Sequence, residues 1–462
     1  MKLHFLGANR QVTGSCYCLE SNGKRLLVDC GLYQERPFKD RNWSPLPIDP
    51  KSINAVAITH VHIDHIGLLP RRVNGGLFAP VYMTRPSADM AQIMLRDSAR
   101  IQEEDAKYKR RRHKKEGREG PHPVEALYTD EDVSQTLPLI QPVDYDQPIL
   151  IADEFSVTYH DAGHILGSSM LEVRTSDGKC IVFSGDIGQH DKPIVRDPTM
   201  LEHADFVVME STYGDRNHPP YGDHEHMLAE LITETIARGG NIVIPTFAVE
   251  RAQELIYYLG RLASANRIPS VPIFLDSPMA ANITEVFVKH RNCFDEEAIG
   301  MFHDGKKVLD IPNLNLSRTR EQSRAINIDD RPSIIMATSG MCTAGRIKYH
   351  LRYNLPREES TILFVGYQAN GSLGRIIKNG TNPVRIHGRQ IEVKAEIKSL
   401  SGFSGHTDQQ GLISWVSHFT PVPKHIFLSH GDEDAAQTLK ELIELNLKTS
   451  VVVPEYQQVV EL

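Results

Sequence analysis

The sequence contains no apolar stretch of about 20 residues, the length that a membrane-spanning helix needs. Its first residues, MKLHFLGANRQVTG, lack the apolar core of a secretion signal. We therefore expect a cytoplasmic protein with no part in a membrane. No internal repeat or low-complexity tract occurs, and the composition, 40% hydrophobic and 24% charged, excludes a disordered or fibrous class.

Cysteine is scarce, with six residues scattered over 462. They have neither the density nor the paired spacing of a disulfide framework or a zinc ribbon. Cys16 and Cys18 lie two apart in the strand-like SCYCLE. This spacing favours two small apolar side chains on one face of a sheet over a metal site.

The chain also lacks an excess of positive charge, since its formal net charge is −8 and its pI is near 6.2. An overall attractive field for a polyanion is thereby excluded. Charges farther apart than about 8 Å are screened at physiological salt, so a local basic groove can still bind nucleic acid.

The length exceeds the roughly 250 to 300 residues at which a single core stops growing, so we expect two domains. The first third contains strand-like segments such as KRLLVDCG, and the segment from Pro86 to about Lys107 is typical of a helix. From Asp205 onward, strands such as NIVIPTFAV alternate with helical segments, which indicates βαβ units around a parallel sheet. The last segment returns to the chemistry of the first third, so one domain is predicted to interrupt another.

The strongest motif is THVHIDH, which directly follows the strand-like AVAIT. Residues two apart at a strand end point the same way, so His60 and His62 can bind one metal ion. Asp64 and His65 lie past the turn and can reach a second ion. Four ligand-type residues within six positions favour a metal site over an ordinary polar turn.

Three further candidate ligands follow apolar strands and are flanked by glycine: His164 in DAGHILGS, Asp186 in FSGDIG and His430 in FLSHGD. With THVHIDH they complete two coordination spheres, in which Asp186 can bridge through its two oxygens. Imidazole-rich sites favour zinc over magnesium, so we expect two zinc ions per chain. Such a pair activates a water and holds the oxygens of a phosphodiester, which is hydrolytic chemistry.

Asp29 ends the strand-like RLLVD and has two interpretations. Its carboxylate can hydrogen-bond a ligand histidine and select the tautomer of that histidine. It can equally begin a turn before Gly31. The sequence leaves both open.

The HxHxDH pattern with the downstream His164 and Asp186 resembles the metallo-β-lactamase superfamily. MESTYGDR around Glu210, FSGHTD around His406 and FLSHGDED around His430 resemble the three signatures of its β-CASP branch, which are nucleases that process nucleic acids. The likeness extends over essentially the whole chain, including PTFAVERAQEL, LDSPMA and ATSGMCTAGR. Within this branch, the chain resembles most the endonuclease subunit of the eukaryotic cleavage and polyadenylation factor and the bacterial and archaeal relatives of that subunit.

This resemblance implies an α/β fold in which a metallo-β-lactamase αββα sandwich carries its metals at one edge. A β-CASP domain of parallel-sheet α/β type is inserted into the sandwich. The implied limits are 1–208 for the first part of the sandwich, 209–392 for the inserted domain and 393–462 for the second part.

The resemblance also implies a role for each candidate residue. One zinc is held by His60, His62, His164 and Asp186. The other zinc is held by Asp64, His65, Asp186 and His430. His406 is implied to protonate the leaving oxygen and Glu210 to orient it, so the expected catalytic residues are Glu210, His406 and Asp64. Taken without the resemblance, His406 equally fits a neighbour of a helix cap, and Glu210 a charge at a strand end.

The resemblance points to RNA as the substrate, because the DNA-directed members typically lack a histidine at the position of His430. No segment like a KH domain or like the extra C-terminal domain of ribonuclease J is seen, which favours an endonuclease. We therefore predict a zinc-dependent ribonuclease acting on single-stranded RNA. The alternatives are a DNA nuclease of the same branch, another hydrolase of the superfamily and a non-catalytic RNA-processing scaffold.

Basic side chains are expected to hold the phosphates of the RNA, with ordinary surface charge as the equal alternative. The candidates are Arg346, Lys348, Arg375 and Lys378. The basic segment 107–118, longer than the family implies, is either a solvated loop or an added RNA contact.

Two further features bear on binding and assembly. Glu250 stands where relatives often have glycine, which questions a close approach of phosphate at that turn. The apolar C-terminal strand can pair across a homodimer.

Overall fold

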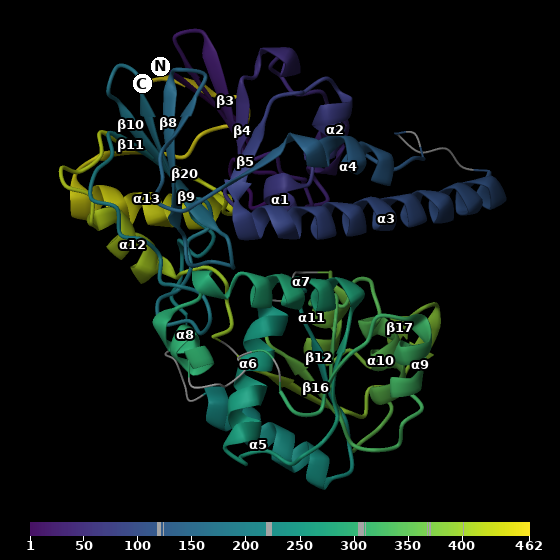
Figure 1. Cartoon of the computed structure of the whole chain (residues 1–462). Helices are drawn as coiled ribbons and strands as arrows, with labels where there is room; N and C mark the ends of the chain where they lie inside the picture. Colours follow the sequence, from purple (N-terminus) through teal and green to yellow (C-terminus); the bar gives the residue numbers. More distant parts are fainter. Residues whose placement is uncertain are drawn as a thin grey trace. The chain divides into compact units, whose positions relative to one another are not determined.

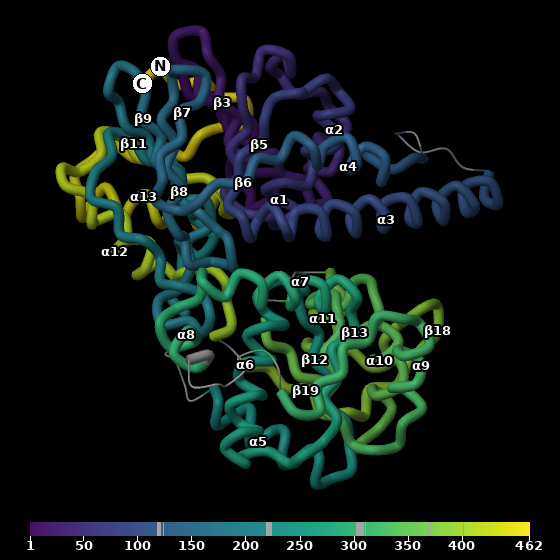
Figure 2. Tube along the Cα trace, in the orientation of Figure 1, coloured from purple at the N-terminus to yellow at the C-terminus, as the bar shows by residue number. Residues whose placement is uncertain are grey.

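The computed structural model describes residues 1–117, 122, 124–218, 224–303, 309, 311–366, 368, 371–400 and 402–462. The chain forms two compact units (Figure 1, Figure 2). Unit 1 comprises Met1–Asp191, Arg196–Asn217 and His406–Leu462, and unit 2 comprises Lys192–Val195 and His218–Gly405. The chain thus leaves unit 1 and later returns to it. The predicted domain limits stay a prediction.

The described strands of unit 1 form two seven-stranded sheets. In spatial order the first sheet contains β22 (Val459–Glu461), β1 (Lys2–Gly7), β2 (Cys16–Ser21), β3 (Lys24–Val28), β4 (Ala55–Ala57), β5 (Val81–Thr84) and β6 (Ile140–Val143). The second contains β21 (Ser450–Val452), β20 (His425–Ser429), β11 (Phe206–Glu210), β10 (Cys180–Phe183), β9 (Ser169–Thr175), β8 (Phe155–Asp161) and β7 (Ile149–Ile151). The C-terminal strand β22 pairs with β1 of its own chain, so the backbone groups along one edge of β22 are already hydrogen-bonded within the chain.

An apolar core joins the two sheets face to face. Side chains alternate along each strand, so Leu3 and Phe5 of β1 both point inward, where Phe5 meets Phe427 of β20 at a ring-centre distance of 5.2 Å. On the outer face of the second sheet, Trp415 and Leu439 belong to one buried cluster with the strands. They come from α12 (Gln409–Ser417) and α13 (Glu433–Leu447).

The first sheet is flanked by α1 (Ile63–Ile66), α2 (Leu69–Asn74), α3 (Arg85–Glu116) and α4 (Asp130–Thr136) (Figure 1). This helix–sheet–sheet–helix order confirms the predicted αββα sandwich. Among the described residues, every helix is too short or too polar to cross a lipid bilayer.

Helix α3 is longer than the sequence analysis predicted. It was expected to end near Lys107, but it continues to Glu116. The basic run consists of helix-forming residues, and the first breaker is Gly117, whose φ of 60° ends the helix in the left-handed conformation. The interpretation of 107–118 as a loop is therefore wrong as far as Glu116, while residue 118 lies outside the described residues.

Unit 2 contains a six-stranded sheet, and its printed strand pairings are all parallel, which confirms the predicted βαβ organisation. In spatial order its strands are β14 (Leu314–Leu316), β13 (Ile273–Asp276), β15 (Ile334–Ala337), β12 (Ile242–Pro245), β16 (Thr361–Phe364) and β19 (Glu396–Ser399). A hairpin is formed by β17 (Val384–Ile386) and β18 (Arg389–Ile391). The described helices of this unit are α5 (His224–Ala237), α6 (Arg251–Ser264), α7 (Pro278–Lys289), α8 (Glu296–His303), α9 (Arg320–Ile326), α10 (Ile347–Asn354) and α11 (Leu373–Lys378).

The turn before α6 explains the unusual residue at position 250. Glu250 has a φ of 65°, a conformation that glycine adopts without steric cost and that other residues rarely adopt. A glycine in relatives fits this backbone geometry directly. Close approach of a phosphate is therefore not needed to account for a glycine there.

A buried charged cluster lies at the carboxyl end of β13. Asp276 is fully buried and accepts hydrogen bonds from Arg346 at 2.7 Å and from Ser323 at 2.6 Å. The Nε2 atom of His350 lies 2.7 Å from the second carboxylate oxygen. Arg346 also donates to the carbonyl of Ser317 at 3.1 Å. Arg346, predicted as a phosphate contact, is thus committed to a structural ion pair.

We expect the Asp276→Asn variant to lose stability in a pH-dependent manner. Burial opposes the charge on Asp276, but hydrogen bonds from His350 and Ser323 outweigh it, so the pKa of this carboxyl is lowered in the folded protein. The stabilisation is therefore present above about pH 3.9 and is lost as the pH falls through the lower folded pKa. Breaking such a buried pair costs about 3 kcal/mol.

Urea unfolding at pH 7 and at about pH 3 measures this difference. The free energy of unfolding should separate the variant from the wild type at pH 7 and separate them less at about pH 3, because the stabilisation is lost below about pH 3.9. Asp330→Asn, an exposed substitution in the same unit, is the matched control. A gap that stays constant or widens at the lower pH contradicts the prediction.

Candidate metal centre

The predicted ligands lie together at one edge of unit 1, on the segments that follow strands. His60 and His62 follow β4, and Asp64 and His65 lie on α1, for which His62 is the N-cap. The remaining ligands follow strands of the second sheet: His164 after β8, Asp186 after β10 and His430 after β20. Residues separated by hundreds of positions therefore meet where the strands of both sheets end.

Glycines with positive φ precede two of these ligands. Gly163 has a φ of 65° and Gly185 a φ of 54°. A Cβ atom on Gly185 would approach the Ser169 carbonyl oxygen to 2.9 Å, and one on Gly163 would approach the Arg196 carbonyl oxygen to 2.7 Å. Glycine thus allows the crowded backbone that supports His164 and Asp186.

The first cluster brings three imidazole nitrogens and one carboxylate oxygen together. His62 Nδ1 lies 3.0 Å from His60 Nε2 and 3.2 Å from His164 Nε2. Asp186 Oδ2 lies 3.3 Å from His60 Nε2 and 3.4 Å from His164 Nε2. Tetrahedral ligands bound to zinc at about 2.0 to 2.1 Å stand about 3.3 Å apart, so this spacing fits a zinc ion.

The second cluster uses the other oxygen of Asp186. Asp186 Oδ1 lies 3.3 Å from His65 Nε2 and 3.5 Å from His430 Nε2. Asp64 Oδ2 lies 3.5 Å from His430 Nε2. Each oxygen of Asp186 thus faces one group of histidines, which is the geometry of a carboxylate between two cations.

The charge state of the site also fits a cation. Burial lowers the pKa of His60 to about 4 and that of His62 to about 3, so both imidazoles have free lone pairs at neutral pH. Burial opposes protonation of His65 as well, but Asp186 and Asp29 raise its pKa well above the usual value. Asp186 Oδ1 and His430 Nε2 are buried without a hydrogen-bond partner. Buried polar atoms of this kind need a partner, and a metal ion would supply one.

His406 and Glu210 form a pair beside the two clusters. His406 Nδ1 lies 3.0 Å from Glu210 Oε1, which also accepts the backbone N–H of Ile187 at 2.6 Å. His406 Nε2 lies 3.8 Å from Asp186 Oδ2. Burial disfavours the imidazolium, but the charges of Glu210 and Asp186 outweigh it and raise the pKa of His406 to about 9. These two carboxylates therefore favour the protonated form of the ring.

Asp29 satisfies both of its interpretations. It has a φ of 57° at the end of β3, as a turn residue can, and its Oδ2 lies 2.8 Å from His65 Nδ1. Its Oδ1 accepts the N–H of Thr59 at 2.8 Å. Because the carboxylate holds Nδ1, His65 presents Nε2 to Asp186.

Asp29→Asn is expected to weaken metal binding by about 10- to 100-fold, because the amide orients His65 less firmly and no longer raises its basicity. Asparagine tolerates the left-handed backbone at this position, so the fold should persist. Competition with a chelator measures the metal affinity. Asp49→Asn, at an exposed turn of the same unit, is the control. Equal chelator sensitivity of the two variants would contradict the role of Asp29.

The sequence analysis missed Thr212. Its Oγ1 lies 3.1 Å from His430 Nδ1 and donates to the His430 carbonyl at 2.9 Å. The hydroxyl therefore orients His430 as Asp29 orients His65. Thr212 belongs to MESTYGDR, so its place two residues after Glu210 was the available signal.

Comparisons with known proteins agree with this geometry. Residues 18–204 match the metallo-beta-lactamase superfamily domain, residues 252–377 the Beta-Casp domain, and residues 390–454 the Zn-dependent metallo-hydrolase RNA specificity domain. A crystal structure of a protein of unknown function from Enterococcus faecalis shares the fold, with a TM-score of 0.53, 13% identity and 99% coverage of both chains.

Two curated relatives are similar over nearly the whole chain. Ribonuclease TTHA0252 of Thermus thermophilus is 35% identical over 96% of this chain and 96% of its own length. Transcription termination factor FttA of Methanosarcina mazei is 31% identical over 96% of this chain and 69% of its own length. The chain therefore belongs to the β-CASP family of metal-dependent nucleases within the metallo-β-lactamase superfamily.

Proposed function

We propose that this protein is a zinc-dependent ribonuclease that hydrolyses single-stranded RNA by internal cleavage and uses two zinc ions per chain. The observation that carries the proposal is Asp186, whose two oxygens each face one cluster of histidines at 3.3 to 3.5 Å. The match to an RNA specificity domain and the similarity to a protein named as a ribonuclease support RNA as the substrate.

The residues present fit zinc better than magnesium. Five of the seven proposed ligands are imidazoles, and magnesium prefers an octahedron of oxygens. Two zinc ions, when bound, would activate a water and stabilise charge on the phosphodiester. We assign His60, His62, His164 and Asp186 to one ion, and Asp64, His65, Asp186 and His430 to the other.

His406 is the proposed acid for the leaving oxygen. Glu210 and Asp186 favour its protonated form, and its Nε2 is directed toward Asp186. Glu210 fixes the ring through Nδ1, so Nε2 holds the proton that is transferred when the phosphorus–oxygen bond breaks. Asp64 is proposed to act as a ligand in the second cluster, where its Oδ2 lies 3.5 Å from His430 Nε2.

The test combines metal analysis with cleavage of a circular single-stranded RNA, a linear RNA and a linear DNA of the same sequence. Two zinc ions per chain and linearisation of the circle support the proposal, because a circle has no end for an exonuclease. Cleavage of the linear RNA alone would replace internal cleavage by an exonuclease reaction. Cleavage of the DNA alone, or of neither strand, would overturn the proposed substrate.

A further inference from the structure

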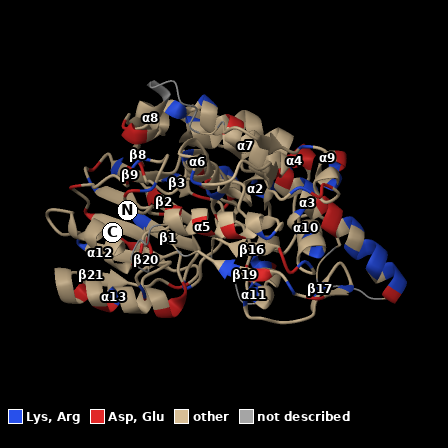
Figure 3. Cartoon of the chain, turned by 90° about the horizontal axis from the view of Figure 1, so that it is seen from below, with Lys and Arg blue, Asp and Glu red and all other residues tan. Residues whose placement is uncertain are grey.

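The distal part of α3 carries an unusual concentration of positive charge. Residues 107–116 read KYKRRRHKKE and include seven Lys and Arg residues but a single carboxylate. Figure 3 shows these residues as a blue band on the outer turns of the helix. We call Lys107–Glu116 the basic tip of α3.

In the part of the chain that the structure describes, the basic tip buries no apolar side chain that would explain its length. The buried residues of α3 end at Ala106, and beyond it every residue of the helix is exposed except His113, which is partly buried. Figure 1 shows this part of the helix continuing past the other helices of unit 1. The apolar face that anchors the first turns of α3 is thus absent from the tip.

The charges of the basic tip are largely unpaired. Among the described residues, ion pairs within 4.0 Å are found for Lys107 with Glu103 and for Arg112 with Glu116. The remaining five cations have no carboxylate within that distance in the described part of the chain: Lys109, Arg110, Arg111, Lys114 and Lys115.

Helix stability does not account for these charges. Cations favour the last turn of a helix because of its dipole, but this effect fades within one turn, and Lys109 to Arg111 lie before the last turn. Cations three or four positions apart, such as Arg111 and Lys115, repel each other and destabilise the helix. The sequence therefore retains charge that weakens the element carrying it.

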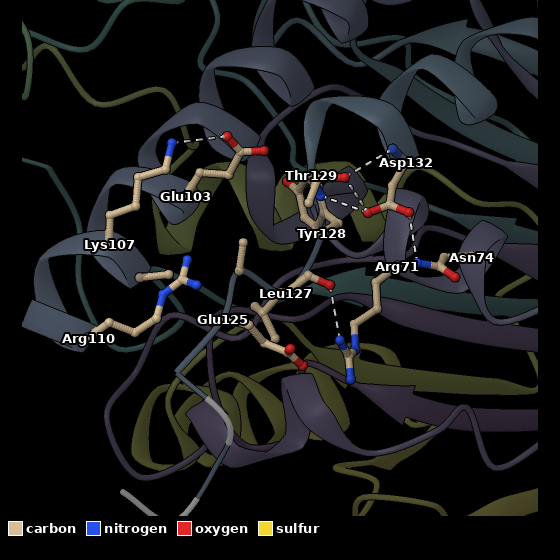
Figure 4. A pocket seen from close by; sticks show the side chains of 12 residues that line it. Arg71, Asn74, Glu103, Lys107, Arg110, Glu125, Leu127, Tyr128, Thr129 and Asp132 are labelled. Carbon is tan, nitrogen blue, oxygen red and sulfur yellow. Dashed lines mark hydrogen bonds and ion pairs between the residues drawn. The ribbon is translucent and has the colours of Figure 1, made fainter. Parts of the chain in front are cut away.

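The hollow at the base of the tip is not where a polyanion would bind. It has a volume of about 400 Å³ and is lined by Arg71, Lys107 and Arg110, but also by the carboxylates of Glu103, Glu125 and Asp132 (Figure 4). The three cations and the three carboxylates that line the hollow carry equal and opposite charge. The excess of positive charge begins on the outer turns of the helix.

We infer that the basic tip is a second RNA-binding surface that holds the substrate backbone away from the metal centre. Charge surrounds the helix instead of forming one stripe, and the only large apolar side chain is Tyr108. A membrane-surface helix or a protein-docking helix would need an apolar face. A polyanion contacted through its phosphates needs only accessible cations.

The position of α3 connects the basic tip to the proposed reaction, on which this inference rests. At the start of the helix, Ser87 donates to the carbonyl of Gly167, in the loop that contains His164. From Ser87 to Lys107 the helix rises about 30 Å at about 1.5 Å per residue. A stacked strand covers that distance with about nine nucleotides at about 3.4 Å each. A stacked RNA shorter than this cannot reach both sites, and only a still shorter RNA fails to reach both when its bases are unstacked.

The test compares a variant with all five unpaired cations replaced by glutamine against the wild type, on RNAs of about 4 and about 30 nucleotides. We expect kcat/KM for the long RNA to fall about tenfold or more at physiological salt, chiefly through KM, and kcat/KM for the short RNA to stay within about twofold. The slope of log KM against log salt should decrease by about 2 to 3, since single strands contribute about 0.7 per phosphate contact.

A charge-matched control carries five glutamines at exposed cations elsewhere in unit 1: Lys24, Arg36, Lys39, Lys51 and Lys448. It should resemble the wild type on both RNAs. Circular dichroism should show at least as much helix in the tip variant, because repulsion is removed. Equal losses for the two variants, or an equal loss on both RNA lengths, would overturn the inference.

Binding of the same long RNA separates this inference from the proposed function. If the wild type cleaves no RNA, the proposed function fails, and the loss of RNA affinity in the tip variant alone still supports the surface. Unchanged RNA affinity, with or without a loss of binding to phosphatidylglycerol vesicles, overturns it.

Discussion

The Asp186→Ala variant is expected to lose bound metal and RNA cleavage together. One carboxylate serves both clusters, because Oδ2 faces His60 and His164 while Oδ1 faces His65 and His430. Its removal takes a ligand from each proposed ion. We expect kcat/KM on single-stranded RNA to fall by about a thousandfold or more, which is about 4 kcal/mol of barrier.

Metal content by mass spectrometry and cleavage of end-labelled RNA measure this effect on the same protein sample. Asp105→Ala is the matched control, because Asp105 is an exposed residue of α3 in the same unit. A cooperative thermal transition for both variants shows that each is folded. If Asp186→Ala kept its metal and cleaved RNA within tenfold of the wild type, the proposed bridging role would be wrong.

The His406→Ala variant is expected to retain metal and to cleave RNA about a hundredfold or more slowly, the usual scale for the loss of a general acid. Its ring lies farther from Asp186, at 3.8 Å, than the proposed ligands do, and Glu210 holds its other nitrogen. The leaving oxygen of RNA is a poor leaving group without a proton. Loss of the acid should therefore slow the step in which the phosphorus–oxygen bond breaks.

A substrate that needs no acid isolates this role. With bis(p-nitrophenyl) phosphate, whose leaving group departs as a stable anion, the defect of His406→Ala should nearly disappear, whereas the Asp186→Ala defect should remain.

An alternative role for His406 is metal binding. The side chains of Asp186, Glu210 and His406 are close enough to one another to form a metal site of their own. Loss of metal from His406→Ala would favour that arrangement over the acid.

Local sequence was sufficient wherever the chemistry lies within a few residues. THVHIDH predicts that His60 and His62 follow a strand and that Asp64 and His65 lie past the turn. In the structure the first pair follows β4 and the second pair lies on α1. The parallel sheet of unit 2 was likewise predictable, because continuous apolar runs between helical segments specify buried strands. The residue patterns that predict both features lie within about ten neighbouring positions, although the strands that pair are far apart in the sequence.

The outer turns of α3 show where local interpretation was incomplete. Of the two alternatives for the basic run, a solvated loop or an RNA contact, the loop is wrong as far as Glu116, because Lys, Arg and Glu all favour helix and no breaker occurs before Gly117. The ion pair of Arg346 also could not be predicted from the sequence. Its partner Asp276 is 70 positions away, and only the pairing of β13 with β15, the strand that precedes Arg346 in the chain, brings them within 2.7 Å.

By itself, the sequence determined which residue types could bind metal, that the ligands follow strands, and that one domain interrupts another. Tertiary structure alone decided that the two oxygens of Asp186 face different histidine clusters and that Asp29 and Thr212 orient two of the ligands. It also decided that the cations of α3 extend from unit 1 with few partners. The physical reason is that distances between side chains of remote segments depend on sheet order and strand register, which are set by packing of the whole core.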